Sequence, residues 1–493
     1  MQLIRDRCTG CAYCVLTCPY DAIVSDGWAA VLADRCTDCN LCAYACPNDC
    51  FIPDVILKPY RPRVRERYDV VVVGAGIGGL MAAAALAQAG RSVAVFEKLG
   101  FPGGRYTEID YHGAAVTTGA WTSLGPQSRI GRFLADLGIE LDYVSLRDVG
   151  LREQYSVRFP GGRHYPSLFD MLTPDVRRAW LRAIASGRRC APDDVSAHDY
   201  VASFSGDPDL LAVVDAIAAT ASGLSSHAMP ASEYVQITLD GREAGGDFAM
   251  PVGGVRSIIR ALIHTLRAAG GDLFVRTPVA RILVADGQAV GVELANAGAE
   301  TPPRQVQADV VVHNGGPRRF VQLVGAQHLP PDYLDRVRRL KGAECAAIFC
   351  ATRQPLFDDA PILMTPGCGR VVGVFSPTRL APALSREGHH LYDAFFPVYD
   401  ADRTAELGLA LADMRALFPG FDDALAWYVP MFFTGNWPGA ESGQTFGQTG
   451  DNRLDPATPI HGLYLVGMDV KGSGAAGDLI PVGVRRLIDI MAL

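Results

Sequence analysis

The sequence lacks the features that mark membrane-spanning, secreted and nucleic-acid-binding proteins. No apolar run approaches the roughly 18 residues that a transmembrane helix needs, and the N-terminal MQLIRDRCTG has no apolar signal-peptide core. Lysine and arginine number 45 against 53 aspartate and glutamate residues, so the formal net charge is −8, which argues against nucleic acid as a partner. We therefore expect a cytoplasmic protein, and peripheral contact with a membrane is compatible with this composition.

Cysteine is scarce beyond residue 50. The chain has 493 residues, of which 49% are hydrophobic, enough for about three domains with buried cores. Only four of its 13 cysteines lie in the long remainder of the chain, and they follow no ligand spacing. We expect these four to be core residues: Cys190, Cys345, Cys350 and Cys368.

Eight of the other nine cysteines form two copies of the pattern C-x2-C-x2-C-x3-C-P, and the copies are 28 residues apart. The first copy contains Cys8, Cys11, Cys14 and Cys18, and the second contains Cys36, Cys39, Cys42 and Cys46. Zinc sites often use two C-x2-C pairs but seldom a Cys-Pro after a third spacing, and disulfides are typical of secreted chains. Iron–sulfur clusters are the favoured interpretation.

This repeat resembles the bacterial two-cluster ferredoxins over about the first 50 residues. In such proteins three thiolates of one run bind one [4Fe–4S] cluster, and the fourth, followed by proline, binds the other cluster. The resemblance implies two metal sites, one with Cys8, Cys11, Cys14 and Cys46 and the other with Cys36, Cys39, Cys42 and Cys18. Cys50 aligns with Ala22 in the repeat, so we expect it to be buried and not a ligand.

Residues 68–105, YDVVVVGAGIGGLMAAAALAQAGRSVAVFEKLGFPGGR, form a complete βαβ unit in the sequence. They predict a strand buried on both faces at 69–73, a helix at 77–89 and a second strand at 92–96. The pattern residues are Gly74, Gly76, Gly79 and Glu97. The glycines allow, in order, a tight turn, close approach of the backbone to a pyrophosphate and helix–strand packing, and the acid accepts hydrogen bonds from a ribose. The free N–H groups at the helix start hold phosphate.

A second glycine pair, Gly103-Gly104-Arg105, follows Glu97 closely, and a nicotinamide domain has no need of it. The series of strand, GAGIGG, acid and GGR resembles the FAD-binding start of the phytoene desaturase and amine oxidase group. In that group the glycine pair and the arginine run along the flavin side of the pyrophosphate. The resemblance therefore implies FAD, with two further contacts: the backbone of Val279 against the adenine, and Asp469 at the ribityl and pyrophosphate.

A second literal G-x-G-x-x-G lies at Gly472, Gly474 and Gly477. Only 16 residues follow Gly477, too few for the helix, strand and acid of another βαβ unit. We interpret this stretch as the start of the last helix, with Gly477 bringing backbone N–H groups to the flavin ring. The sequence therefore indicates no NAD(P)H-binding domain.

The expected fold class is an α/β FAD-binding Rossmann-like domain, discontinuous in sequence, with an α+β substrate domain and a preceding small α+β ferredoxin domain. The predicted ranges are 1–57 for the ferredoxin domain, 58–67 for a linker, 68–120, 247–317 and 456–493 for the FAD domain, and 121–246 and 318–455 for the substrate domain. Helices are predicted within the substrate domain at 128–137, 174–185, 208–221 and 401–417, and a strand at 390–398.

The predicted function is that of an FAD-dependent oxidoreductase in which two [4Fe–4S] clusters relay electrons to reduce carbon–carbon double bonds. We expect an apolar, isoprenoid-like or polyene substrate and an external low-potential electron donor or acceptor, with no indication of oligomeric state. Two alternatives stay open: a desaturase or isomerase of the phytoene desaturase type, and an electron-transfer module for a partner enzyme. No catalytic residue is predicted, because Thr117 stands where the family often has an acid. The nearby proton donors are Tyr106, Glu108, Asp110 and His112.

Overall fold

The computed structural model describes residues 1–53, 63–120, 125–243, 248–295, 304–434, 437, 441–474 and 476–492. The linker residues 58–62 and the predicted boundaries at 121 and 246–247 lie outside the described residues. The described end of the linker is fastened to the next domain, because Arg304 donates to the carbonyl of Val64 and Arg67 pairs with Asp309. Arg67 is also the first residue of a strand, β5, so the strand begins two residues before the predicted start.

The N-terminal segment, residues 1–53, contains the two cysteine runs in two matching halves. β1 pairs with β4 and β2 pairs with β3, all antiparallel. The elements are β1 (Gln2–Leu3), η1 (Arg5–Arg7), α1 (Tyr13–Thr17), β2 (Ile23–Ser25), β3 (Ala29–Val31), α2 (Leu41–Ala45) and β4 (Phe51–Ile52). Three pairs of left-handed residues recur 28 positions apart: Gly10 and Asp38, Ala12 and Asn40, and Asp21 and Asp49. The sequence repeat is therefore also a repeat of backbone conformation.

The first large sheet grows from the predicted βαβ unit. Its strands run in the order β13-β6-β5-β16-β15-β14, with β22 pairing to β16. β13, β6, β5, β16 and β22 pair in parallel, whereas β14, β15 and the first half of β16 form an antiparallel ribbon. The strands are β5 (Arg67–Val73), β6 (Val93–Phe96), β13 (Asp272–Phe274), β14 (Val279–Ala285), β15 (Gln288–Leu294), β16 (Arg304–His313) and β22 (Leu463–Leu465).

Helices cover both faces of this sheet, which explains its unbroken apolar strands. Val70 and Val72 of β5 face α3, α10 and α16, whereas Val71 and Val73 face the side of α11 and α12. The helices are α3 (Ile77–Gln88), α10 (Arg256–Ala268), α11 (Pro317–Val324), η3 (Ala326–His328), α12 (Pro331–Arg338), η5 (Ala476–Leu479) and α16 (Ile480–Ile490). The predicted strand buried on both faces is confirmed at β5.

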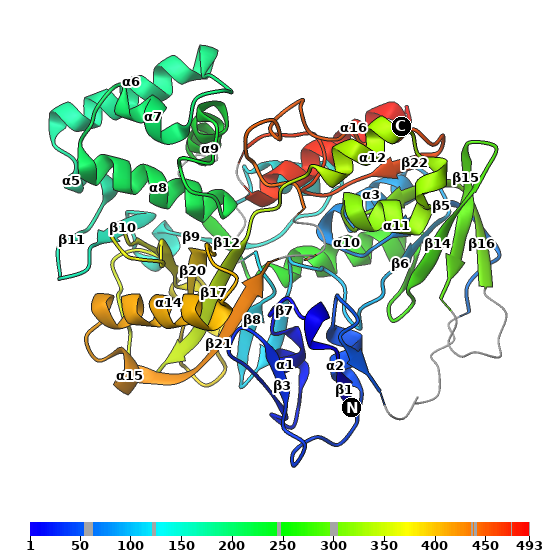
Figure 1. Ribbon diagram of the computed structural model, residues 1–493, viewed down its shortest axis with the longest axis horizontal. Helices are drawn as coiled ribbons and strands as arrows, with labels where there is room; N and C mark the ends of the chain where they lie inside the picture. The colour runs from blue at the N-terminus through cyan, green and yellow to red at the C-terminus, as the bar shows by residue number, and fades with distance from the viewer. Residues whose placement is uncertain are drawn as a thin grey trace.

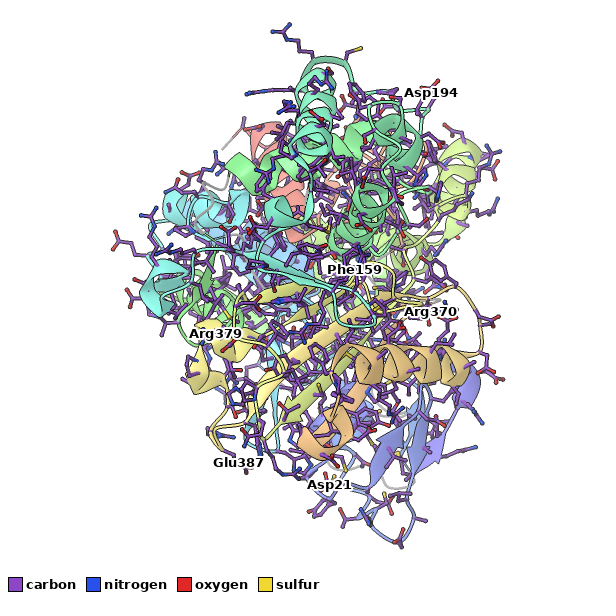
Figure 2. The ribbon with its side chains drawn as sticks, turned by 90° about the vertical axis from the view of Figure 1, so that its left-hand side faces the viewer. Asp21, Phe159, Asp194, Arg370, Arg379 and Glu387 are labelled. Atoms are coloured by element: carbon purple, nitrogen blue, oxygen red, sulfur yellow. The ribbon has the colours of Figure 1, made fainter. Side chains whose placement is uncertain are left out.

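A second sheet has the order β11-β10-β18-β19-β20-β17-β21. One face packs on α14 (Arg403–Leu417), through alternate residues such as Ile348 of β17 and Ala394 of β20. The strands are β10 (Tyr155–Arg158), β11 (His164–Tyr165), β17 (Cys345–Thr352), β18 (Ile362–Met364), β19 (Gly373–Phe375), β20 (His390–Pro397) and β21 (Leu425–Phe433). The helical region of residues 168–243, with Asp194 between two of its helices, lies at one end of the molecule, and Asp21 of the N-terminal segment lies at the other (Figure 2).

The remaining elements connect these layers. The helices are α4 (Arg129–Asp136), η2 (Arg147–Val149), α5 (Leu168–Met171), α6 (Pro174–Cys190), α7 (Ala197–Ala202), α8 (Pro208–Ser222), α9 (Ala231–Glu243), α13 (Pro377–Leu380), η4 (Pro382–Leu384) and α15 (Phe421–Ala424). Two strand pairs complete the list, β7 (Glu108–Tyr111) with β8 (Ala114–Thr117) and β9 (Tyr143–Ser145) with β12 (Ala249–Pro251). Four helices and one strand predicted for the substrate domain are present as α4, α6, α8, α14 and β20.

The N-terminal segment adjoins both sheets at the bottom of the molecule, next to β7, β8 and β21 (Figure 1). Its contact with β21 includes a backbone hydrogen bond of 2.9 Å from Phe432 to Gly10. Its contact with the first sheet includes the backbone hydrogen bond of 2.8 Å from Gly100 to Tyr44. Among the described residues, no helix combines the length and the apolar composition that crossing a membrane would require.

Candidate functional site

A cavity of about 1040 Å³ lies at the centre of the molecule, at the carboxyl ends of the parallel strands. It is lined by residues of the first sheet, the second sheet and the N-terminal segment. Nine of the ten residues predicted to bind the cofactor line it: Gly74, Gly76, Glu97, Gly103, Gly104, Arg105, Val279, Asp469 and Gly477. The tenth, Gly79, packs beneath it, where an added Cβ would lie 2.2 Å from the carbonyl oxygen of Gly74. This close approach fits its predicted role in helix–strand packing.

The glycine-rich loop between β5 and α3 leaves a helix N-terminus open to the cavity. Gly74 has a φ of +100°, which favours glycine, and Gly76 is the N-cap of α3 without any side chain that accepts from its N–H groups. Gly76, Ile77 and Gly78 all line the cavity. These unpaired N–H groups and the positive end of the helix dipole suit a phosphate.

A backbone hydrogen bond joins the second glycine pair to this loop. The N–H of Gly103 donates to the carbonyl of Ala75 over 2.7 Å, and Gly103 has a φ of +105°. A Cβ on Gly103 would lie 2.7 Å from Cβ of Thr107. The two glycine motifs that the sequence predicts as separate cofactor contacts are therefore one continuous wall of the cavity.

Glu97 is buried at the end of β6 and organises the same wall. Its carboxylate accepts the backbone N–H groups of Ala75 over 2.7 Å and of Leu99 over 2.8 Å. Burial raises the pKa of Glu97, and these hydrogen bonds oppose the shift because they stabilise the charged form. Each carboxylate oxygen has more than one lone pair, so the residue can hold the loop and still accept from a ribose.

The cavity lining also contains Asp469, which accepts the backbone N–H of Ser442 over 2.8 Å. Two residues that the sequence analysis missed hold this region together. Arg453, 1% exposed, donates to four backbone carbonyls, including those of Val470 and Ser442. Asn314, at the end of β16, donates to the carbonyl of Val466 over 3.0 Å and lies against the glycine loop. The stretch HNGG after a buried strand was the available sequence signal for Asn314. No comparable signal marks Arg453.

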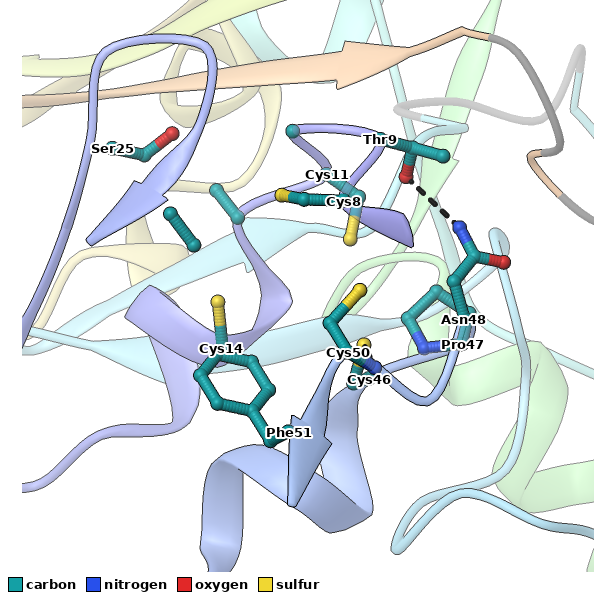
Figure 3. A pocket seen from close by; sticks show the side chains of 13 residues that line it. Cys8, Thr9, Cys11, Cys14, Ser25, Cys46, Pro47, Asn48, Cys50 and Phe51 are labelled. Atoms are coloured by element: carbon teal, nitrogen blue, oxygen red, sulfur yellow. Dashed lines mark hydrogen bonds between the residues drawn. The ribbon is translucent and has the colours of Figure 1, made fainter. Parts of the chain in front are cut away.

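The cysteines lie in two groups, each around a small cavity. Cys8, Cys11, Cys14 and Cys46 surround the first, together with Cys50, as Figure 3 shows. Cys18, Cys36, Cys39 and Cys42 surround the second. The structure thus brings together the same two sets of four that the sequence predicts, and in each set the fourth thiol comes from the other run. Four thiols around one space fit a cuboidal cluster.

The two cysteines that precede proline have the same local geometry. Cys18 accepts the backbone N–H of Ala22 over 3.4 Å, and Cys46 accepts that of Cys50 over 3.3 Å. Such hydrogen bonds to sulfur help to set the reduction potential of a cluster. The Cys50 thiol also lines the first cavity, and hydrogen bonds from it lower the pKa of Cys8 to about 6 and of Cys46 to about 7.

The first cysteine group shares a wall with the central cavity. Cys8, Thr9, Pro47 and Asn48 line both spaces, and the side chain of Asn48 donates to Thr9 over 3.3 Å (Figure 3). Lys98, next to Glu97, donates to the carbonyl of Pro47. None of the residues around the second cysteine group lines the central cavity among the described residues. The first cysteine group is therefore the inner one, adjacent to the central cavity, and the second is the outer one, farther from it.

Tyr13, between Cys11 and Cys14, connects the first cysteine group to the GGR loop. Tyr13 is 1% exposed, and its hydroxyl donates to the carbonyl of Thr118. The same hydroxyl oxygen lies 3.5 Å from the carbonyl oxygen of Gly104. Its ring packs edge-on against Trp437, with centroids 5.2 Å apart. Both Tyr13 and Trp437 line the central cavity.

We expect Tyr13→Phe to lower the free energy of unfolding by about 1–3 kcal/mol, because it leaves the buried carbonyl of Thr118 without its donor. Tyr20→Phe, at a ring 48% exposed, is the matched control and should change little. Denaturant unfolding at equal iron content measures both. Equal losses in the two variants would contradict a connecting role for Tyr13.

Three of the four candidate proton donors named from the sequence do not line the central cavity. Glu108 accepts the backbone N–H groups of Val255 and Arg256 at the start of α10, over 2.7 and 2.8 Å. Asp110 pairs with Arg256 over 2.9 Å, and His112 lies 3.4 Å from Asp21 near the surface. Of the four, only Tyr106 lines the central cavity.

Another part of the central cavity, here called the apolar arm, lies over the second sheet and has mostly apolar lining residues. It is lined by Cys345 and Ala347 of β17, Phe395 of β20, Phe433 of β21 and the last turn of α8. Thr220 and Ser222 in that turn donate their hydroxyls to backbone carbonyls of α8, which leaves a largely apolar surface. Such a surface suits an apolar ligand.

Known sequences resemble two parts of the chain. Residues 77–478 match the family of flavin-containing amine oxidoreductases, and residues 1–24 match the 4Fe-4S binding domain. An uncharacterised protein of Methanocaldococcus jannaschii is 25% identical over 423 residues, which is 85% of this chain and 98% of that protein. A zeta-carotene-forming phytoene desaturase of Myxococcus xanthus is 31% identical over 291 residues, 50% of this chain and 53% of the desaturase. Prolycopene isomerase 2 of an Oncidium hybrid cultivar is 27% identical over 389 residues, and the chain spans 64% of its length.

Solved structures share the same fold. An oxidoreductase from Methanosarcina mazei has a TM-score of 0.75 and 27% identity, over 85% of this chain and 99% of its own. A Pyrococcus furiosus protein has a TM-score of 0.68 and 22% identity, over 87% of this chain and 98% of its own, and this second likeness concerns the fold alone.

Proposed function

The chain belongs to the flavin-containing amine oxidoreductase family, and on that premise we propose that it uses electrons from two [4Fe–4S] clusters to reduce carbon–carbon double bonds. As a member of this family it is an FAD-dependent oxidoreductase. The proposed substrate is an apolar isoprenoid-like molecule or polyene, and the proposed partner is an external low-potential electron donor. The observation that carries the proposal is the wall that Cys8, Thr9, Pro47 and Asn48 share between the first cysteine group and the central cavity.

The direction of electron flow follows from what the chain contains. A desaturase that loads two electrons onto FAD can pass them to a quinone or oxygen, and fused clusters would add little. A reductase must refill its flavin, and no nicotinamide domain is indicated by the sequence. Each cluster carries one electron, so two clusters match one flavin reduction. Ferredoxin-type clusters can reach potentials of about −400 mV, and clusters at such a potential in this chain would pass electrons downhill to a flavin and then to an alkene.

The residues of the cavity have distinct tasks in this reaction. Bound FAD supplies the hydride chemistry, and the protein holds it and orients the substrate. The open N-terminus of α3 and the Gly103–Gly104 loop would hold the pyrophosphate of FAD, while Glu97 would accept a hydrogen bond from its ribose. Arg453 and Asp469 fix the segment that carries Ser442. The apolar arm between α8 and the second sheet excludes water and holds the substrate.

Of the two alternatives, only one has specific support. The similarity to a phytoene desaturase and to a prolycopene isomerase favours a desaturase or isomerase. An electron-transfer module for a partner enzyme would use the clusters and the flavin alone. The apolar arm weighs against such a module, because a relay has no need of a substrate cavity.

The test is an anaerobic turnover with a panel of acyclic isoprenoid polyenes in detergent micelles. With a low-potential reductant, we expect products two mass units heavier than the substrate, because a hydride and a proton have been added. With a quinone in place of the reductant, we expect no product. A loss of two mass units with quinone, and no reaction with reductant, would show that the direction is the reverse.

A further inference from the structure

We propose that Asp393 is the acid that delivers the proton to the substrate in the apolar arm of the cavity. The assignment rests on the proposed function and adds a named residue to it. Asp393 lies in the middle of β20, is 2% exposed, and lines the central cavity. No sequence motif surrounds it, and it comes from the second sheet, not from the region of residues 106–112 where the sequence placed its candidate donors.

The strand pairing places Asp393 on the cavity side of the sheet. Successive strand residues face opposite sides, and Tyr392, Ala394 and Phe396 lie in the core under α14. Asp393 and Phe395 therefore face the other side, and both line the cavity. Across the ladders, Asp393 is opposite Phe349 of β17 and Phe375 of β19.

The neighbours on this face of the sheet are apolar, and this isolates the carboxyl group. They are Cys345, Ala347 and Phe349 of β17, Phe375 of β19, Leu391 and Phe395 of β20, and Val429, Met431 and Phe433 of β21. One carboxyl oxygen of Asp393, Oδ1, has no hydrogen-bond partner among the described residues. A buried polar group without a partner lowers stability, so its retention on an otherwise apolar wall indicates a task other than folding.

Burial alone raises the pKa of Asp393 to about 7. The titratable groups that interact with it are the thiols of Cys345 and Cys350 on β17. β19 and the last turn of α8 present none, and Arg379 of α13 acts on His390 at the start of β20 instead. A carboxyl group that is protonated near neutral pH can act as a general acid.

The chemical step balances as follows. The double bond takes up a hydride, one proton with two electrons, from the reduced flavin at one carbon, which leaves the flavin oxidised. The second carbon takes the proton of Asp393 as the π bond breaks and the new C–H bond forms. The carboxylate that remains regains a proton from water, and the external low-potential donor restores the two electrons and one proton of the flavin through the clusters and solvent.

The test compares Asp393→Asn with Asp413→Asn in the holoenzyme. Asp413 lies on the α14 side of the same sheet, and its carboxylate accepts the N–H groups of Gly369, Arg370 and Val371 over 2.6 to 3.0 Å. With the low-potential reductant and the polyene panel, Asp393→Asn should slow product formation by about 10²- to 10⁴-fold, the usual contribution of a general acid. The rate of flavin reduction by the reductant should stay unchanged, and Asp413→Asn should turn over like the wild type.

Two further measurements do not depend on turnover. The infrared difference spectrum of wild type minus Asp393→Asn should contain a protonated carboxyl band that disappears with a midpoint near pH 7. Glu108 and Glu441, whose pKa values burial also raises to about 7, contribute equally to both proteins and cancel in this difference. The folded state binds the Asp393 proton more tightly than the unfolded chain, so wild-type stability should fall as pH rises from about 4 towards 7. Asp393→Asn should therefore melt at a higher temperature than the wild type at pH 8.5, whereas Asp413→Asn should melt at a lower one.

The possible outcomes distinguish a wrong assignment of Asp393 from a wrong proposed function. Product formation at the wild-type rate by Asp393→Asn, or a loss of its stability at pH 8.5 like that of Asp413→Asn, would overturn the assignment of Asp393 alone. A wild type that reduces its flavin but converts no polyene would overturn the proposed function, and with it the substrate on which Asp393 acts.

Discussion

Gly76→Val should give a folded protein that retains its iron and has lost its FAD. The Cβ of a residue at position 76 would point into the crowded junction between α3 and Asn314, 2.5 Å from Oδ1 of that side chain. The two valine methyl groups would then occupy the space in front of the N-terminus of α3, where a phosphate must approach. Flavin absorbance after gel filtration, with iron and protein determined on the same sample, measures the result.

The matched control is Gly408→Val, on the exposed side of α14, where nothing lies within 4 Å of an added Cβ. This variant should bind FAD like the wild type. A second pair of variants tests whether a Cβ at position 76 acts on the phosphate or on Asn314. If Gly76→Ala weakens FAD binding only by displacing Asn314, then adding Asn314→Ala should restore FAD binding in the double variant. Full FAD in Gly76→Val, or FMN in the wild type, would contradict the predicted cofactor site.

Local sequence patterns predicted the parts of the site that are local in space. The βαβ unit is specified by consecutive residues, so its strand, its glycine turn and the acid at its end lie where the pattern places them. The resemblance of the cysteine repeat to two-cluster ferredoxins likewise predicted which thiols lie together, and the structure repeats the same left-handed conformation at Ala12 and Asn40. The domain boundaries and the metal content stay predictions.

Residues whose position depends on strand pairing were not predictable in this way. Asp393 is one acid in an apolar strand, and only its pairing with β17 and β19 shows that it faces the cavity. Arg453 lies in irregular structure and finds its four carbonyl partners only in the folded chain. Strand pairing also decides which side chains are buried in the antiparallel ribbon. Val279 and Ile282 of β14 are buried, whereas Val290 of β15 is 39% exposed, and a register shift interrupts its ladder with β14.

Cys46→Ala and Cys18→Ala should each leave about four of about eight iron atoms per chain, because each removes one thiolate from a different four-iron cluster. The two variants should differ in what they do to the flavin. Cys46 belongs to the group that shares a wall with the central cavity, and Cys18 belongs to the outer group. Loss of the inner cluster, the one in the first cysteine group, should lower the rate of flavin reduction to that of direct reduction by the chemical reductant. The double variant Cys18→Ala, Cys46→Ala measures that direct rate.

Loss of the outer cluster should have a different effect, since electrons from a small-molecule reductant can still enter at the inner cluster. We expect Cys18→Ala to retain flavin reduction by such a reductant and to lose it with a ferredoxin-sized donor that must dock over the outer group. Cys50→Ala is the control, because its thiol lines the first cavity but the repeat assigns it no iron. Iron loss in Cys50→Ala with full iron in Cys46→Ala would mean that Cys50 is the fourth ligand. Equal flavin reduction by Cys46→Ala and the wild type would contradict an electron path through the inner cluster.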